Sequence, residues 1–168
     1  MNIEKIISNV TSGSDLSEDE TFQIINAIFE GKISEEKIIS FLQALSEKGE
    51  SVEEIVGAVK SMRKHSIKVN TNLKDLVDCC GTGGLGKNIM NISTCSAFVA
   101  AAGGVKIAKH GNRTSTGVSG SADILEAAGV NISIDSEKVS KCIESVGIGF
   151  MFAQNHHPGM KYVMPARA

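Results

Sequence analysis

The chain has 168 residues, of which 42% are hydrophobic and 21% charged, so it is too apolar for a disordered protein and can bury one or two small cores. A formal net charge of −2, few aromatic residues and no tryptophan argue against nucleic-acid binding. The apolar runs are shorter than a membrane span, and the N-terminus lacks the hydrophobic core of a signal peptide. We therefore expect a cytoplasmic protein that binds neither nucleic acid nor membrane.

Charge and glycine content divide the chain into two halves. Residues 1–70 carry 8 basic and 12 acidic side chains, whereas residues 71–168 carry 9 basic and 7 acidic ones and most of the glycines. The first half predicts four short helices, because apolar residues recur at helical spacing after capping residues such as Ser17 and Ser51. Helices with one apolar face must pack together, so residues 1–70 are expected to form a helical bundle, a common place for subunit contact.

The second half alternates short β-type runs with helices. We predict strands at 76–80, 105–109 and 148–153, separated by helices at 93–102, 121–128 and 136–146. This alternation implies right-handed crossovers, so the predicted fold class is α/β: an N-terminal helical bundle domain plus a partial parallel-sheet domain over 71–168. Parallel sheets bind ligands beyond the carboxyl ends of their strands, where the loops that follow the three predicted strands are expected to converge.

The loop after the first predicted strand is rich in glycine and leads into a helix. Its residues 81–87, Gly-Thr-Gly-Gly-Leu-Gly-Lys, offer backbone amides to a phosphate group. They fit the dinucleotide pattern G-x-G-x-x-G, but no acidic residue follows before Asp123 to hold a ribose hydroxyl. They also fit G-x-x-x-x-G-K, but Asn88 stands where a P-loop has Ser or Thr. We favour a phosphate ligand, and a glycine turn without a ligand is the alternative.

The loop after the second predicted strand adds cations and hydroxyl groups. Lys109, His110 and Arg113 are possible donors to an anion, and residues 114–121 supply hydroxyls and glycines without steric bulk. The simplest interpretation is that this loop binds a second phosphate group, and a solvated loop without a ligand is the alternative.

The third loop, residues 154–161, contains the adjacent pair His156 and His157. Adjacent residues seldom ligate one metal ion together, so we interpret this loop as a wall of the pocket. Arg167 near the terminus is suited to bidentate contact with a carboxylate, but the residues alone favour an exposed cation.

Several longer motifs follow one another along the chain. They are GTGG and NIST within residues 81–94, AKHGNR at 108–113, GSADILEAAG at 120–129 and FMFAQNHHPGMKYVMPAR at 150–167. Together with the segment 41–63 of the first half, they resemble anthranilate phosphoribosyltransferase over nearly the whole chain. The resemblance implies transfer of phosphoribose from 5-phosphoribosyl pyrophosphate to the amine of anthranilate, with Mg²⁺, in tryptophan biosynthesis. It also implies a homodimer formed through the helical domain.

The resemblance further implies the roles of individual residues. No catalytic nucleophile is expected, because the chemistry depends on positioning and on stabilising the charge of the leaving group. The residues that would hold the phosphoribosyl donor are Gly81, Gly84, Asn91, Ser93, Thr94, Lys109 and Ser121. Ser93 would also contact Mg²⁺, and anthranilate would be held by Gly81, Asn112 and, through its carboxylate, Arg167.

The chain departs from the family pattern at several positions. Leu85 stands where the family usually has Asp, Ile89 where it has Thr, and residues 116–118 where it has Ser-Ser-Lys. Family members also continue into a further half that completes the sheet and carries an acidic pair for magnesium, so we interpret the chain as the N-terminal half of such an enzyme. Two alternatives are a related pyrimidine nucleoside phosphorylase and a non-catalytic binding or dimerisation module of the same fold.

Overall fold

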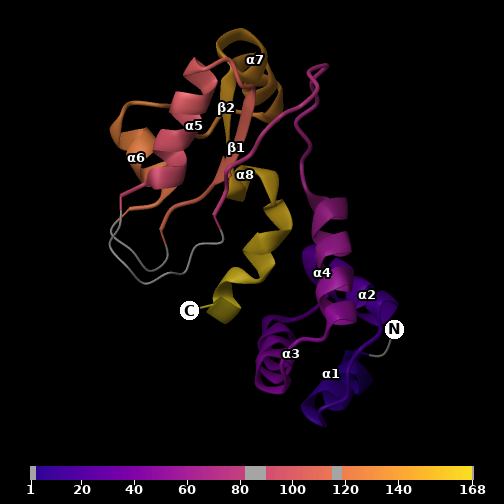
Figure 1. The fold of residues 1–168 in the computed structure, drawn as a ribbon. Coiled ribbons are helices and arrows are strands. Elements are labelled where there is room, and N and C mark those ends of the chain that lie inside the picture. Colours follow the sequence, from indigo (N-terminus) through magenta and orange to yellow (C-terminus); the bar gives the residue numbers. More distant parts are fainter. Residues whose placement is uncertain (1–2, 82–89, 115–118, 168) are drawn as a thin grey trace. The chain divides into compact units, whose positions relative to one another are not determined.

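The structure is a computed structural model that describes residues 3–81, 90–114 and 119–167 (Figure 1). Contacts within the chain divide it into two compact units. The helical unit comprises Met1–Ser66 and His157–Ala168, and the α/β unit comprises Ile67–His156. The last twelve residues thus belong with the helices, whereas the division by composition groups them with the second half. No helix in the described part of the chain is both long enough and apolar enough to cross a membrane.

The helical unit contains the four predicted helices, α1 (Ile3–Thr11), α2 (Glu18–Phe29), α3 (Glu35–Lys48) and α4 (Val52–His65). Two of them begin at the predicted capping boxes. The Ser17 side chain accepts a hydrogen bond from the Glu20 amide, and Ser51 accepts one from the Glu54 amide. These bonds satisfy backbone donors that a helix start otherwise leaves open, so the caps fix where α2 and α4 begin.

The apolar faces of these helices form one core, in which Ile24, Ile28 and Phe41 are fully buried. A glycine lets α4 approach α2, because a Cβ atom at Gly57 would lie 2.4 Å from the Glu18 carbonyl oxygen. Two short 3-10 helices, η1 (Pro158–Tyr162) and η2 (Met164–Arg167), complete the unit. Tyr162 packs against the core, which explains why the C-terminal segment belongs with the helices.

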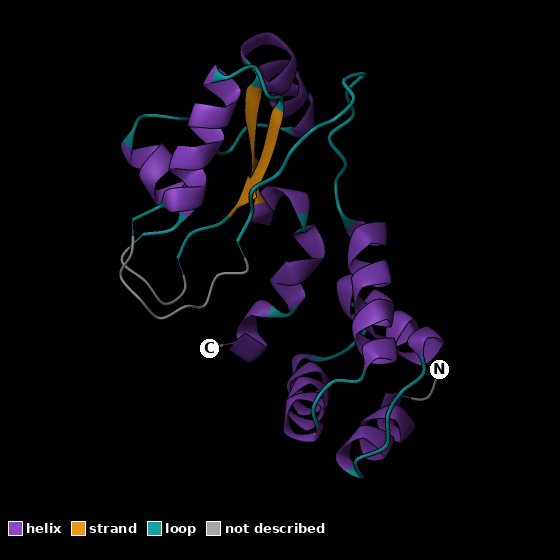
Figure 2. Cartoon of the chain, viewed as in Figure 1, coloured by secondary structure: helices purple, strands orange, loops and turns teal. Residues whose placement is uncertain are grey.

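The α/β unit contains two parallel strands and their helices. The elements are α5 (Ile92–Ala102), β1 (Ile107–Gly111), α6 (Ser121–Ala127), α7 (Ser136–Val146), β2 (Ile148–Phe152) and α8 (Ala153–His156). The strands pair in register from Ile107 opposite Ile148 to Gly111 opposite Phe152, and Figure 2 shows them in orange. The predicted helices agree with α5, α6 and α7 to within one residue, and the parallel sheet is confirmed. The strand predicted at 105–109 begins and ends two residues later, so Lys109 and His110 lie within β1 and not in the loop that follows it.

The helices of this unit bury the apolar residues of the strands. Val139 and Ile143 of α7 pack with Ala108 of β1. Ala122 and Leu125 of α6 pack with residues of β2. The two ends of the unit also meet: the Ile67 amide donates to the His156 carbonyl oxygen at 2.9 Å, and His156 Nδ1 lies 3.0 Å from the Ile67 carbonyl oxygen.

The strand predicted at 76–80 is reduced to a single bridge. Val77 pairs with Ile107 in parallel, its amide donating to Lys106 O at 2.9 Å and its carbonyl accepting from Ala108 N at 3.0 Å. The next donor on β1 that would extend this ladder is the amide of His110, which donates instead to Asp78 Oδ1 at 3.2 Å. A side-chain acceptor thus competes with the ladder, which does not continue past Val77, and the prediction of a full strand is wrong.

Candidate functional site

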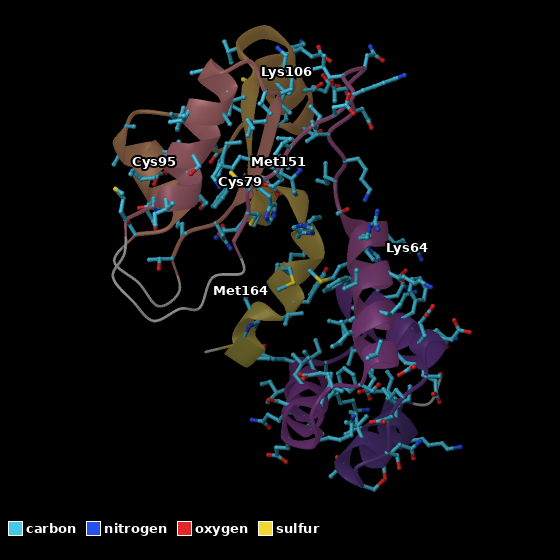
Figure 3. The ribbon with its side chains drawn as sticks, viewed as in Figure 1. Lys64, Cys79, Cys95, Lys106, Met151 and Met164 are labelled. Carbon is cyan, nitrogen blue, oxygen red and sulfur yellow. The ribbon has the colours of Figure 1, made fainter. Side chains whose placement is uncertain are left out.

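The predicted site residues of the α/β unit lie where β1 ends and α5 begins. A chain of contacts joins these segments through Cys79, whose thiol donates to the Ser93 carbonyl oxygen at 3.1 Å and lies 4.0 Å from Lys109 Nζ. Figure 3 labels Cys79, together with Lys106, which precedes β1 at its other end. The structure therefore links Ser93, in the first turn of α5, with Lys109, the middle residue of β1, through Cys79.

Lys109 is the most unusual charged residue of the unit. It is 2% exposed, and the only polar partner of its ammonium group within the described residues is the Cys79 sulfur at 4.0 Å. An ammonium group buried without a counter-charge costs several kcal/mol, on the order of the desolvation penalty of a buried ion. A bound anion would remove this cost, so Lys109 is a candidate contact for a phosphate.

The N-terminus of α5 is open to a ligand. Asn91 precedes the helix but gives it no side-chain cap, and the first turn carries no acidic residue. The Thr94 hydroxyl is buried and has no hydrogen-bond partner among the described residues. The amides and the positive end of the helix dipole favour an anion at this position, and Thr94 offers it a further donor. Ser93, half-buried beside it, makes no side-chain hydrogen bond to a described residue.

Asn91 connects the two predicted phosphate loops instead of capping its helix. Its Nδ2 donates to the Ser119 carbonyl oxygen at 3.2 Å, and the Ser119 hydroxyl donates to Asn91 Oδ1 at 2.9 Å. Further along this second loop, the Asn112 carbonyl oxygen accepts from the Ala122 amide at 3.1 Å and from the Ser121 hydroxyl at 3.4 Å. The predicted residues thus make a network of three separate groups of contacts: Cys79 with Ser93 and Lys109, Asn91 with Ser119, and Asn112 with Ser121.

Arg113 has a different role from the one predicted. Its guanidinium group makes two bonds to Glu126, at 2.6 and 2.9 Å, and a third to Asp123 at 3.3 Å. These carboxylates raise the pKa of Arg113, with the Glu126 hydrogen bonds as the largest cause. The interpretation of Arg113 as a donor to a bound anion is therefore not supported, because α6 carboxylates already occupy its guanidinium group.

His110 is also a poor source of positive charge. Burial lowers its pKa, and this outweighs the opposing effect of the Asp78 carboxylate. The ring is therefore neutral at pH 7, with Nδ1 3.6 Å from the Cys80 sulfur. Of the three residues expected to bind an anion, Lys109 is the basic side chain that is buried and has no carboxylate partner among the described residues.

The remaining predicted residues lie apart from this network. Gly81 is exposed, with no atom within 4 Å of the position that a Cβ would occupy, so a ligand can reach its backbone. Gly84 lies outside the described residues, as do the departures at Leu85, Ile89 and 116–118. Arg167 ends η2 and belongs to the helical unit.

The donor set near Lys109 decides which kind of metal binding is feasible. No group of three or more His, Cys, Asp or Glu side chains suited to a metal occurs in the parts of the chain that the structure describes. The side-chain oxygens at the start of α5 are the neutral hydroxyls of Ser93 and Thr94. Such a donor fits Mg²⁺ held mainly by water and by the phosphates of a substrate, and it does not fit an all-protein metal cage.

The carboxylates of α6 are functional neighbours that sequence reasoning missed. Asp123 and Glu126 lie three residues apart and therefore share a helix face, which is a signal for a cation partner. The prediction for Arg113 did not use this spacing, and it consequently left the guanidinium group without a partner.

Fold and site together define a two-domain protein, with a helical bundle and a parallel α/β unit that carries the candidate site. The chain matches the glycosyl transferase family, helical bundle domain, over residues 4–66, and the glycosyl transferase family, a/b domain, over residues 73–168. The chain therefore belongs to this glycosyl transferase family.

Within the family, the chain is similar to anthranilate phosphoribosyltransferases. It is 50% identical over 165 residues to the enzyme from Acetivibrio thermocellus and 48% identical over 167 residues to that from Teredinibacter turnerae, covering 98% and 99% of this chain. The crystal structure of the Thermus thermophilus enzyme superposes with a TM-score of 0.87 at 41% identity, over 96% of this chain and 49% of that one. The Saccharomyces cerevisiae enzyme in complex with PRPP and Mg gives a TM-score of 0.88 at 30% identity, over 98% and 50%. The chain spans about half the length of the curated relatives it matches.

Proposed function

We propose that this chain supplies the donor-binding half of an anthranilate phosphoribosyltransferase. The observation that carries the proposal is the buried Lys109 ammonium, which has no carboxylate partner among the described residues and is linked through Cys79 to Ser93 at the start of α5. In the reaction, pyrophosphate leaves C1 of the ribose, positive charge develops on the sugar, and the amine of anthranilate attacks C1. A buried cation and helix amides stabilise the pyrophosphate as its negative charge grows.

The proposed donor site comprises Gly81, Gly84, Asn91, Ser93, Thr94, Lys109 and Ser121. Mg²⁺ would supply charge neutralisation at the pyrophosphate, with the Ser93 hydroxyl as its protein contact. Asn91 and Ser119 hold the two loops together, so the donor would meet amides and hydroxyls whose positions are already set. Gly81, Asn112 and Arg167 are proposed to hold anthranilate, the arginine through the carboxylate.

Binding of the donor is the first test. Isothermal titration of the wild-type chain with 5-phosphoribosyl pyrophosphate and Mg²⁺ is expected to show one site, with ATP and NAD as comparison ligands. A ligand that binds only the folded protein also raises its melting temperature, by about 5 °C or more for a domain of this size at 100 times Kd. Absence of binding by the donor, or equal binding of ATP, would contradict the proposal.

Turnover is a separate test, because the chain spans half the length of its relatives. Anthranilate fluorescence is expected to fall when donor and Mg²⁺ are added together with the polypeptide that corresponds to the remaining half. Phosphate-dependent cleavage of uridine under the same conditions would favour the nucleoside phosphorylase alternative. Donor binding without turnover in any combination would favour a non-catalytic module.

We further propose that the chain forms a homodimer through the helical unit and acts in the cytoplasm. Val52, Ile55 and Val59 of α4 are 71%, 52% and 46% exposed and lie at the spacing of one helix face, which is typical of an interface. Light scattering of the wild type against Val59→Lys tests the dimer, since a mass unchanged by the substitution would contradict this interface.

The cytoplasmic location is proposed from the chemistry of the donor. The donor is a highly charged phosphate ester that does not cross membranes unaided, so the enzyme that consumes it belongs in the compartment where the donor is made.

A further inference from the structure

One carboxylate closes the base of the loop that follows β1. Asp123 Oδ2 accepts hydrogen bonds from the Thr114 amide at 3.0 Å and from the Gly120 amide at 2.7 Å. Its other oxygen, Oδ1, accepts from Arg113 Nη1 at 3.3 Å. The two amides stand on opposite sides of residues 115–118 in the sequence, so a single side chain ties the two ends of the loop together.

Backbone packing at the same point leaves little room for rearrangement. A Cβ atom at Gly120 would lie 2.5 Å from Thr114 N and 2.6 Å from Asn112 O. At Gly111 it would clash with the Ser121 hydroxyl oxygen. The two loop ends therefore touch through their backbones at Gly120, and Gly111 leaves room for the Ser121 side chain. The acceptor that serves both of these ends comes from α6.

The Arg113 ion pair adds a second and weaker tie. Glu126 receives both guanidinium nitrogens, but the side chains of Arg113 and Glu126 are 44% and 50% exposed. Exposed ion pairs are screened by water and contribute little. Asp123, at 28% exposure and with two backbone donors, is the more strongly held carboxylate.

The residue next to Gly120 extends this arrangement to the other loop. Ser119 bonds Asn91 in both directions, at 2.9 and 3.2 Å, and Asn91 precedes α5. A carboxylate that fixes Gly120 also fixes the adjacent Ser119, and through it Asn91. Asp123 therefore restrains Thr114 and Gly120 directly, and Asn91 through Ser119.

We propose that Asp123 is a positioning residue that sets Asn112, Ser121 and Asn91 in the geometry required by the phosphoribosyl donor. The ligand in this inference, the phosphoribosyl donor, rests on the proposed function. The claim that Asp123 holds the loop ends together does not depend on it. Asp123 itself does not contact the donor in this proposal. It acts by removing freedom from groups that do, and a displacement of about 1 Å in such groups can cost about 100-fold in rate.

The test is Asp123→Asn in the full 168-residue chain. Asparagine has the same shape, but it replaces one acceptor oxygen with an NH₂ group, so either the two amides or Arg113 must face a donor. We expect hydrogen exchange of the Thr114 and Gly120 amides, followed by NMR, to accelerate about tenfold, and the Kd for donor with Mg²⁺ to rise about tenfold. The NMR resonances of Asn112 and Ser121 should shift as well.

Two matched variants separate positioning from general stability. Glu126→Gln removes the Arg113 pair but keeps both Asp123 amide bonds, and it should change exchange and Kd by less than about threefold. Asp135→Asn removes a carboxylate that accepts the Lys138 amide at 2.8 Å at the start of α7, remote in sequence from the proposed donor residues. It should leave the exchange of Thr114 and Gly120, and the Kd, at wild-type values.

The outcomes are distinct. Wild-type exchange rates at Thr114 and Gly120 in Asp123→Asn would overturn the proposal, as would an equal loss of donor affinity in Asp135→Asn. If the wild-type chain binds no donor, the proposed function fails for this chain, and exchange still decides whether Asp123 holds the loop. Faster exchange with unchanged donor affinity would overturn the positioning role and leave Asp123 a structural residue.

Discussion

The two units differ in the partners that they give to a buried charged side chain. In the helical unit, Glu54 is 1% exposed, and its oxygens accept bonds from the Leu16 amide at 2.9 Å, the Ser51 amide at 2.7 Å and Lys48 Nζ at 2.9 Å. In the α/β unit, Lys109 is equally buried, but its ammonium group has only a thiol at 4.0 Å within the described residues. The first charge is satisfied by the protein, whereas the second has no charged partner among the described residues, as the proposed donor site requires.

The largest expected effect comes from removing the satisfied charge. Glu54→Gln leaves Lys48, which is 7% exposed, with only Asp15 as an acidic partner among the described residues. Breaking one side of a buried pair is expected to lower the free energy of unfolding by about 3 kcal/mol. Urea denaturation measures the change. Glu18→Gln, which breaks the exposed pair with Lys60, is the control and should cost less than about 1 kcal/mol. Equal losses in the two variants would contradict the distinction.

Lys109→Met should act in the opposite direction on stability. Replacing an uncompensated buried charge with an apolar side chain of similar length is expected to raise the free energy of unfolding by about 2 kcal/mol. The same variant should lose the rise in melting temperature caused by the donor and Mg²⁺. A destabilised variant that still binds the donor would show that Lys109 is structural and that the comparison between the units is wrong.

The pH dependence of stability should distinguish the two charges next. Burial raises the pKa of Glu54, but the Ser51 and Leu16 amides and the Lys48 ammonium outweigh it and hold this pKa below its ordinary value of 4.5. A carboxyl group with a depressed pKa in the folded state stabilises above its unfolded pKa, and this contribution is lost as pH falls through the folded value. We expect the stability difference between wild type and Glu54→Gln to be constant from about pH 7 to 5.5 and to shrink below about pH 4.5. A difference that grows on acidification would refute this assignment.

The smallest expected effect concerns the buried hydroxyl at the start of α5. Thr94→Val removes an oxygen that has no partner among the described residues and keeps the side-chain shape. Unfolding free energy should rise by about 0.5 kcal/mol or stay unchanged, because no hydrogen bond is lost within the protein. The Kd for the donor should rise about fivefold, measured by titration calorimetry. Ser96→Ala, on an exposed position of the same helix, is the control and should leave this Kd unchanged.

Much of the fold could be predicted from local pattern. Capping serines and apolar periodicity located the helices, because a cap and a helical face are encoded within a few residues of each other. The strand predicted at 76–80 failed for a non-local reason. Asp78 takes the amide of His110, a partner 32 residues away, and no local rule reveals that competition.

The candidate site likewise has features that local sequence predicts and features that depend on distant residues. Lys109 was identified because a cation at the end of a predicted parallel strand faces the ligand edge of the sheet. Its lack of a carboxylate partner among the described residues, the quality that makes it functional, depends on burial and on every neighbouring element. Arg113 was predicted in the same loop, yet it lies after β1 and pairs with carboxylates of α6, whereas Lys109 lies within β1.

The hydrogen bonds between Ile67 and His156 join the first and last residues of the α/β unit. The unit is therefore an insertion within the helical unit, with its entry and exit side by side. Such an insertion can be exchanged, enlarged or removed by recombination at two adjacent points, since domains with neighbouring termini tolerate transfer between hosts. A short glycine-serine linker from residue 66 to residue 157 should then yield the helical unit alone, because closing so small a gap costs little chain entropy.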